Sequence, residues 1–173
     1  PGLTVLEYDP ALLTTAFADF ADWHSNASPL VGIITDRMPF GDLVLDITGV
    51  AHLFDGEAPM LRSLLARLRT LGYTVRGAIA STIGAAWAVS HFSRSQVVPD
   101  HAFAETLDPL PVAALRLDDI QIGLLSQMGL DTIGDLRSRP RKPLLARFGA
   151  SLVIRLDQAY GRVDAGASTA PAQ

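Results

Sequence analysis

Residues 41–49 read Gly-Asp-Leu-Val-Leu-Asp-Ile-Thr-Gly, and this stretch decides the fold class of the chain. Its apolar and β-branched part, 43–48, predicts a strand. A second apolar run, 30–35, predicts the strand before it. The connection between them, 37–42, contains Pro39 and Gly41 and is typical of a hairpin. The stretch is therefore expected to pair with its neighbour in a sheet.

Helical patterns flank this hairpin. Before it, apolar residues recur at helical spacing from Leu13 to Ala21, and Asp9-Pro10 is a typical helix start. After it, the pattern predicts in turn an amphipathic helix over 57–71 ended by Gly72, a strand over 73–80, an Ala-rich helix over 81–92 and a short strand over 96–98. This order predicts an α+β fold, with a mixed sheet covered by helices on one face.

The pattern changes at 108–111, which reads Asp-Pro-Leu-Pro. Beyond it the sequence predicts only short helices, over 111–115, 118–128, 132–138, 143–148 and 150–160. We therefore expect an α+β domain over 1–107 and a small all-helical domain over 108–163. Residues 164–173 are mostly small and read as a linker or tail.

Composition excludes several classes of protein. With 49 % hydrophobic and 18 % charged residues, the chain of 173 residues is expected to bury a core and not to be disordered. Disulfides and thiolate metal sites are excluded because the chain has no cysteine. No membrane-spanning run or basic leader is visible, so the cytoplasm is the expected compartment. The net charge of −4 argues against a protein that simply coats nucleic acid.

Charge is unevenly spread along the chain. Before Met60 the sequence is acidic, and Arg37 is its only basic residue. Four basic residues crowd together later, at Arg137, Arg139, Arg141 and Lys142. Such a run can contact backbone phosphates without reading sequence, or it can be a solvated basic loop. The sequence leaves both interpretations open.

Three motifs resemble the Y-family of translesion DNA polymerases. The stretch 41–49 resembles the palm strand of that family, and 77–81 stands where the family has a Gly-Ile-Ser strand end. The stretch 117–136 resembles the thumb, in which a helix-hairpin-helix precedes a Leu-Gly-x-x-Thr-Ile-x-Asp-Leu pattern. Their order and spacing agree with the family over nearly the whole chain. The resemblance implies a palm-type sheet domain followed by a helical, helix-hairpin-helix-like thumb.

The departures from the family pattern concern catalysis. Gly41-Asp42 align with an adjacent Asp-Glu pair, so a glycine stands where the family has a metal-binding aspartate. The family's triphosphate-binding lysine has no counterpart near Gly84, and a further family aspartate lies upstream of the part of the palm seen here. Phosphoryl transfer uses two divalent ions, which Asp42 alone cannot organise. Asp46 lies on the same strand face but fits better as a turn residue that bonds nearby N–H groups.

This pattern of losses resembles a non-catalytic group within the family, to which 45–57 and 84–88 are also similar. For such a protein the resemblance implies a scaffold in bacterial damage-induced mutagenesis and translesion synthesis, with no enzyme activity, no cofactor and no metal. The implied partners of the whole protein are a sliding clamp, a RecA-like accessory protein and an error-prone polymerase.

Two alternatives remain at this point. One is an active translesion polymerase whose site is completed elsewhere, and Gly41 argues against it. The other is a DNA-binding helix-hairpin-helix module joined to an unrelated α+β domain. A hairpin that grips DNA has a glycine-rich turn, whereas this chain has Asp118 and Asp119 there, which we expect to cap the next helix. Any DNA binding is therefore expected to be weak, non-specific and salt-sensitive.

Overall fold

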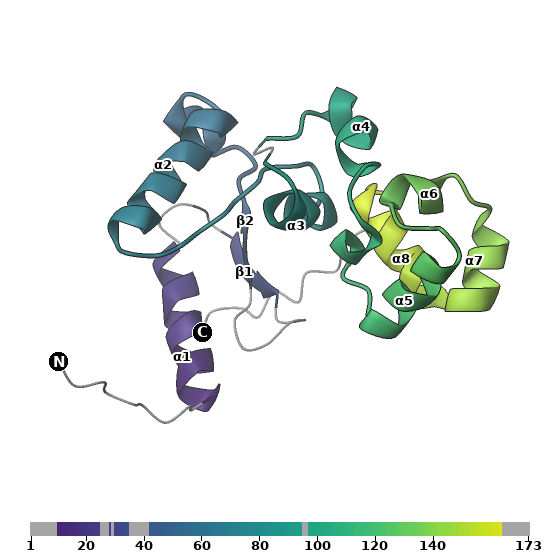
Figure 1. The fold of residues 1–173 in the computed structure, drawn as a ribbon. Helices are drawn as coiled ribbons and strands as arrows, with labels where there is room; N and C mark the ends of the chain where they lie inside the picture. Colours follow the sequence, from purple (N-terminus) through teal and green to yellow (C-terminus); the bar gives the residue numbers. More distant parts are fainter. Residues whose placement is uncertain (1–9, 25–27, 29, 35–41, 95–96, 164–173) are drawn as a thin grey trace. The chain divides into compact units, whose positions relative to one another are not determined.

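A computed structural model describes residues 10–24, 28, 30–34, 42–94 and 97–163 of the chain (Figure 1). The chain divides into two compact units, one ending at Val50 and the other beginning at Ala51. The predicted tail over 164–173, the helix start at Asp9 and the hairpin connection up to residue 41 lie outside the described residues.

The first unit contains the predicted hairpin and the helix before it. Helix α1 (Pro10–Trp23) contacts strand β1 (Leu30–Ile34), which pairs antiparallel with β2 (Asp42–Asp46). The register places Leu30 opposite Asp46. Ser28 is buried, and its hydroxyl donates to the carbonyl of Asp46 at 2.5 Å, which ties the approach to β1 to the end of β2. The sequence thus predicted both strands to within two residues.

The second unit opens with the short 3-10 turn η2 (Ala51–Phe54) and helix α2 (Glu57–Thr70). Met60, Leu61 and Leu65 of α2 are buried, while its arginines are exposed, so the helix is amphipathic as predicted. Gly72 follows with a φ of +92°, a left-handed conformation that suits glycine and ends the helix.

The strand predicted over 73–80 is wrong. Among the described residues this segment pairs only at Ile79, which forms an isolated parallel bridge with Val97. A strand needs a partner along its length, and here Tyr73 and Thr74 are exposed while Gly77 packs closely against Leu61 and Leu65 of α2. The sheet of the described part is therefore two-stranded and antiparallel, not mixed, although the α+β class is confirmed.

Helices make up the rest of the second unit. They are α3 (Ile83–Phe92), η3 (Asp100–Ala102), α4 (Phe103–Leu107), η4 (Val112–Leu115), α5 (Asp119–Gln127), α6 (Ile133–Arg137), α7 (Arg141–Phe148) and α8 (Ala150–Ala159). Each short helix predicted over 111–160 is present, the first as a 3-10 turn, whereas η3 and α4 were not predicted. None of the helices in the described ranges is long and apolar enough to cross a bilayer.

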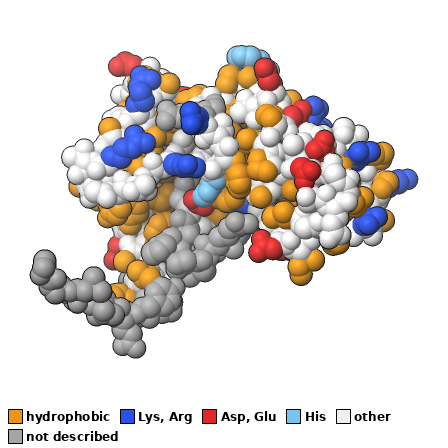
Figure 2. All heavy atoms as spheres, in the orientation of Figure 1, with side chains coloured by type: hydrophobic (Ala, Val, Ile, Leu, Met, Phe, Trp, Pro, Cys, Tyr) orange, Lys and Arg blue, Asp and Glu red, His pale blue; other side chains and the backbone are white. Residues whose placement is uncertain are grey.

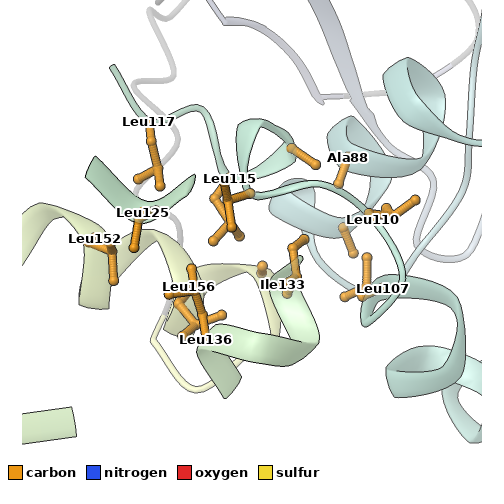
Figure 3. Close-up of a cluster of buried hydrophobic side chains, with 14 of the residues drawn as sticks. Ala88, Leu107, Leu110, Leu115, Leu117, Leu125, Ile133, Leu136, Leu152 and Leu156 are labelled. Atoms are coloured by element: carbon orange, nitrogen blue, oxygen red, sulfur yellow. The ribbon is translucent and has the colours of Figure 1, made fainter. Parts of the chain in front are cut away.

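One buried apolar cluster holds these helices together (Figure 3). Leu125, Ile133, Leu136, Leu152 and Leu156 are fully buried in it. Each such side chain contributes roughly 1.5–3 kcal/mol of burial free energy. Ala85, Ala88 and Val89 of α3 and Leu107 of α4 belong to the same cluster. The domain boundary suggested by the sequence at 107/108 therefore lies inside a continuous core.

The crossing of α3 and α8 depends on Gly84. A Cβ atom at this position would lie 3.0 Å from the Cα of Ala159 and 3.2 Å from its backbone nitrogen. Thr82 caps α3 by accepting a hydrogen bond from the N–H of Ala85, and its hydroxyl donates to the carbonyl of Ala159 at 2.9 Å. Glycine at 84 thus lets two helix backbones approach each other closely.

We predict that Gly84→Ala lowers the free energy of unfolding by about 1–3 kcal/mol, because the backbone of α8 must move away from the new methyl group. The matched control is Gly123→Ala on α5, where nothing lies within 4 Å of an added Cβ. That change should raise stability by about 0.5–1 kcal/mol through helix propensity. Urea-induced unfolding measures both, and equal effects of the two substitutions would contradict the packing argument.

Candidate functional site

The two aspartates of the palm-like strand lie at opposite ends of β2. Asp42 begins the strand and Asp46 ends it. Residues four apart in a strand are on one face but about 13 Å apart along it. The ions of a two-metal site are about 3.5–4 Å apart, and each needs ligands at about 2 Å. Asp46 therefore cannot replace the carboxylate that Gly41 lacks.

Asp46 has a structural role at the end of β2. Its carboxylate accepts the backbone N–H of Thr48 at 2.9 Å. The hydroxyl of Thr48, together with that N–H, lowers the pKa of Asp46 below its ordinary value. This confirms the prediction that Asp46 bonds the turn after the strand.

Two further positions that the sequence singled out are Gly41 and Gly84. Gly41 lies outside the described residues. Gly84 is buried in α3, where it packs on α8. Among the described residues, no group of three or more His, Asp or Glu side chains is placed to hold a metal ion.

The segment after α4, where the sequence suggested a boundary, is firmly integrated into the helical core. The N–H groups of Ile133 and Gly134 donate to the carbonyls of Leu110 and Asp108, each at 2.9 Å, and Val112 donates to Asp131 at the same distance. This short pairing fixes the start of α6. The Asp-Pro-Leu-Pro stretch is therefore a packed element of the helical core.

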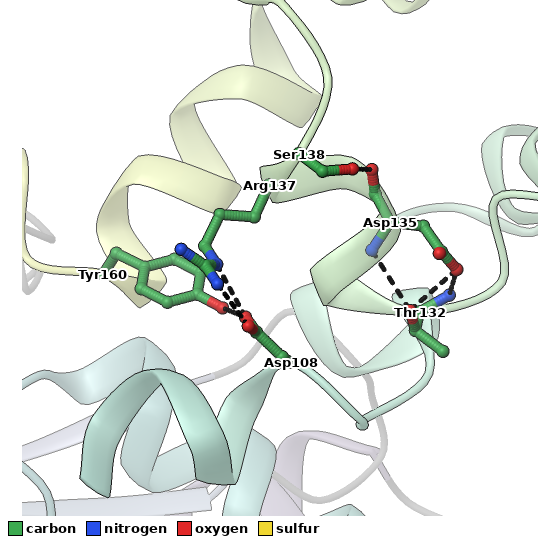
Figure 4. A network of polar contacts seen from close by, with 6 residues as sticks. All are labelled: Asp108, Thr132, Asp135, Arg137, Ser138 and Tyr160. Atoms are coloured by element: carbon green, nitrogen blue, oxygen red, sulfur yellow. Dashed lines mark hydrogen bonds and ion pairs between the residues drawn. The ribbon is translucent and has the colours of Figure 1, made fainter.

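The carboxylate of Asp108 joins α6 and α8 (Figure 4). The guanidinium of Arg137 donates to both of its oxygens, with Nε at 2.8 Å from Oδ1, and the hydroxyl of Tyr160 donates to Oδ1 as well. Burial acts to raise the pKa of Asp108, but the bonds from Arg137 and Tyr160 outweigh it and lower the pKa. Burial and the nearby Asp108 raise the pKa of Tyr160 well above its ordinary range, so Tyr160 remains a donor.

Of the four residues predicted to contact DNA, two form ion pairs within the fold and two face solvent. Arg137 is bound to Asp108, and Nη2 of Arg141 donates to Asp157 at 2.6 Å. The other guanidinium nitrogen of Arg141, Nη1, is buried. Arg139 and Lys142 are exposed, and within the described part of the chain neither forms an ion pair. The sequence run therefore mixes two cations that hold the fold with two that face solvent.

The thumb-like motif at 132–136 is explained by helix capping. Thr132 and Asp135 form a capping box, in which Oγ1 of Thr132 accepts the N–H of Asp135 at 3.1 Å and Asp135 accepts the N–H of Thr132 at 2.9 Å (Figure 4). Ile133 and Leu136, the apolar members of the motif, are fully buried. The motif therefore starts α6 and anchors it in the core.

The aspartate before α5 also has a capping role. Asp118 is the N-cap of the helix, and its carboxylate accepts the N–H of Gln121 at 2.7 Å. This confirms that the turn expected to grip phosphate in a DNA-binding hairpin is used here for capping. The helix-hairpin-helix itself stays a prediction.

A basic hollow was missed by sequence reasoning. It has a volume of about 250 Å³ and is lined by Leu65, Arg69, Arg76, Gly77, Ser90, Ser93 and Arg94. The three arginines are dispersed in the sequence and meet only because the C-terminal parts of α2 and α3 fold around residues 76–77. In Figure 2, Lys and Arg side chains gather over α2. No local sequence signal marks such a cluster.

Comparisons with known proteins agree with the motifs. No family model matches the chain. The chain is 42 % identical over 162 residues to Protein ImuB of Caulobacter vibrioides, across 93 % of this chain and 34 % of that protein. It is 24 % identical over 141 residues to DNA polymerase IV of Shewanella sp., across 78 % of this chain and 39 % of that protein. The chain thus spans little more than a third of the curated relatives it matches.

The fold has a counterpart among solved structures. The crystal structure of DinB from Sulfolobus solfataricus matches with a TM-score of 0.68, across 95 % of this chain and 49 % of that one, at 12 % identity. That likeness concerns the fold alone. Together with the sequence matches it confirms the predicted resemblance to Y-family polymerases. The similarity to ImuB agrees with the resemblance of 45–57 and 84–88 to one group within that family.

We predict that Asp108→Asn lowers the free energy of unfolding by about 1–2 kcal/mol at pH 7, because the bonds from Arg137 and Tyr160 lose their charged acceptor. The pKa of Asp108 is lowered in the folded chain, so its contribution is present above the ordinary aspartate pKa of about 3.9 and is lost as the pH falls through the folded value. We therefore expect the unchanged chain and the Asp108→Asn variant to differ less in free energy of unfolding near pH 3 than at pH 7, as measured by urea unfolding.

The control for this comparison is Asp131→Asn, an exposed aspartate close to the same helix start. It should change stability by less than about 0.5 kcal/mol at either pH. A pH-independent effect of Asp108→Asn would mean that shape and not charge matters at this position.

Proposed function

We propose that this chain, a relative of ImuB with the fold of a Y-family polymerase, is the palm and thumb of a non-catalytic scaffold in DNA-damage tolerance. The observation that carries the proposal is the composition of the palm strand. The sequence has a glycine at 41, and the two aspartates of this stretch lie at the two ends of β2. A role at bacterial DNA places the protein in the cytoplasm.

The chemistry of nucleotide addition supports the non-catalytic assignment. Two divalent ions must be held by shared carboxylates to activate the attacking oxygen and stabilise the leaving one. Asp46 is engaged with Thr48 at the end of β2 and is too far along the strand to share an ion with Asp42. The place near Gly84 where the family has a triphosphate-binding lysine is occupied by the packed crossing of α3 and α8.

A polymerase fold without catalysis is suited to assembling other proteins. By resemblance, the partners of the full-length protein are a sliding clamp, a RecA-like accessory protein and an error-prone polymerase. We assign the contacts with these partners to the full-length protein as a whole, of which this chain supplies the polymerase-like part.

Contact with DNA is proposed to be weak and limited to backbone phosphates. Of the basic run, Arg139 and Lys142 are the residues free to contact phosphate, because Arg137 and Arg141 are bound to Asp108 and Asp157. A solvated basic loop is the competing interpretation, and binding measurements separate the two.

We predict that the full-length protein does not extend a primer with Mg²⁺ or Mn²⁺, and that Gly41→Asp does not restore extension. The carboxylate introduced by Gly41→Asp restores only one part of a site whose residues act together. The measurement is single-nucleotide incorporation on a primer-template, with a DNA polymerase IV assayed in parallel as the positive control. Clear incorporation by the Gly41→Asp variant would favour the alternative of an enzyme silenced at one position.

We predict that the double change Arg139→Ala and Lys142→Ala lowers the slope of log affinity against log salt by about 1–2 for single-stranded DNA. The effect should be the same for different base sequences, since phosphate contacts carry no sequence information. Fluorescence anisotropy at several salt concentrations measures it, with Arg62→Ala on α2 as the control. An unchanged slope would show that the loop is only a solvated surface.

A further inference from the structure

The hollow lined by Arg69, Arg76 and Arg94 has the features of an anion site. Arg69 comes from the last turn of α2, Arg76 from the segment after it, and Arg94 from just beyond α3. Ser90 and Ser93 add two hydroxyl groups to the lining, and Leu65 forms its apolar wall. All of these residues belong to the second unit.

The arginines are positioned but retain donors for a ligand. Nη1 of Arg76 donates to the carbonyl of His91 at 2.9 Å, and Nη2 of Arg69 makes a longer contact of 3.4 Å with the carbonyl of Val75. A guanidinium has five N–H donors, so one bond orients it and leaves four. Arg94 has no hydrogen bond or ion pair to any described residue.

The charge of the hollow is not balanced by its own lining. No acidic side chain is among the described residues that line it, and the neighbouring positions 95–96, outside the described part, are Ser and Gln. The C-terminal ends of α2 and α3 add a partial negative charge of roughly −0.5 each. These partial charges are smaller than the three full positive charges. The hollow is therefore a cationic site within a chain of net charge −4.

We propose that this hollow binds a phosphate group. Guanidinium groups form paired, charge-assisted hydrogen bonds with phosphate oxygens. The volume of about 250 Å³ leaves room for a phosphate group. The group is either a free phosphate or a phosphate of a nucleic-acid backbone.

The first experiment titrates the full-length protein with pyrophosphate at low salt in a calorimeter. Arg94→Gln should weaken binding about ten-fold, because one charged donor group is lost. Arg94→Lys keeps the charge but loses the planar fork and should bind with intermediate affinity. Arg62→Gln is the matched control: it removes one charge from α2 outside the hollow and should change affinity less than two-fold.

The variants are chosen so that an effect on pyrophosphate binding can be distinguished from an effect on folding. Arg94 makes no bond within the described chain, so its removal should leave the urea unfolding curve unchanged. Arg69→Gln is a second variant in the lining of the hollow, and it should weaken pyrophosphate binding in the same way. An absence of binding by the unchanged protein, or equal affinity in the Arg94→Gln, Arg69→Gln and Arg62→Gln variants, would overturn the proposal.

The second experiment distinguishes the source of the phosphate. An oligonucleotide without terminal phosphates is added as a competitor of pyrophosphate. Displacement that is lost in Arg94→Gln identifies backbone phosphate as a ligand, whereas a lack of displacement identifies a free phosphate. Both outcomes support the site. Tighter binding of a poly-glutamate peptide than of pyrophosphate, with the same dependence on Arg94, would overturn the phosphate assignment in favour of an acidic protein segment.

Discussion

The helical part of the second unit depends on how Asp108 is held. Its carbonyl accepts the N–H of Gly134, and its carboxylate accepts bonds from Arg137 and Tyr160, so one residue ties the segment after α4 to α6 and to the end of α8. Gly134 packs so close that an added Cβ would lie 3.0 Å from the Cβ of Asp108. The buried leucines provide most of the free energy of folding, but they are not directional. The polar contacts at Asp108 select one arrangement of these helices.

Much of the fold could be predicted from local patterns, because most elements carry their own start and stop signals. Thr132 and Asp135 form the capping box that starts α6, and Asp118 caps α5. The strand expected over 73–80 could not be excluded in this way, since a strand is defined by a partner and not by its own residues. Likewise the Asp-Pro-Leu-Pro stretch has the composition of a linker, and only its pairing with residues 131–134 shows that it is part of the core.

The parts of the candidate site that could be predicted are those where the chemistry requires a particular type of residue. The glycine at position 41 is read directly from the sequence, which also predicts the turn role of Asp46, and the bond from Thr48 confirms that role. The basic run was harder to interpret, because proximity in sequence does not show which arginines are already paired within the fold. Asp108 and Asp157, which bind Arg137 and Arg141, lie 29 and 16 residues away from them. Arg69, Arg76 and Arg94 pose the reverse problem, since they meet only in three dimensions.

The close approach of α3 and α8 bears on how such a chain can evolve. With the backbone of Ala159 against Gly84 and the hydroxyl of Thr82 bonded across the same crossing, a residue with any side chain at 84 is tolerated only if α8 shifts as well. A change to a longer side chain at position 84 of α3 therefore requires coordinated substitutions in two helices. Mutations arrive singly, and by the same packing argument a side chain added at 84 before α8 has shifted would lower the stability of the fold. The close packing of α8 against position 84 therefore favours keeping a glycine there.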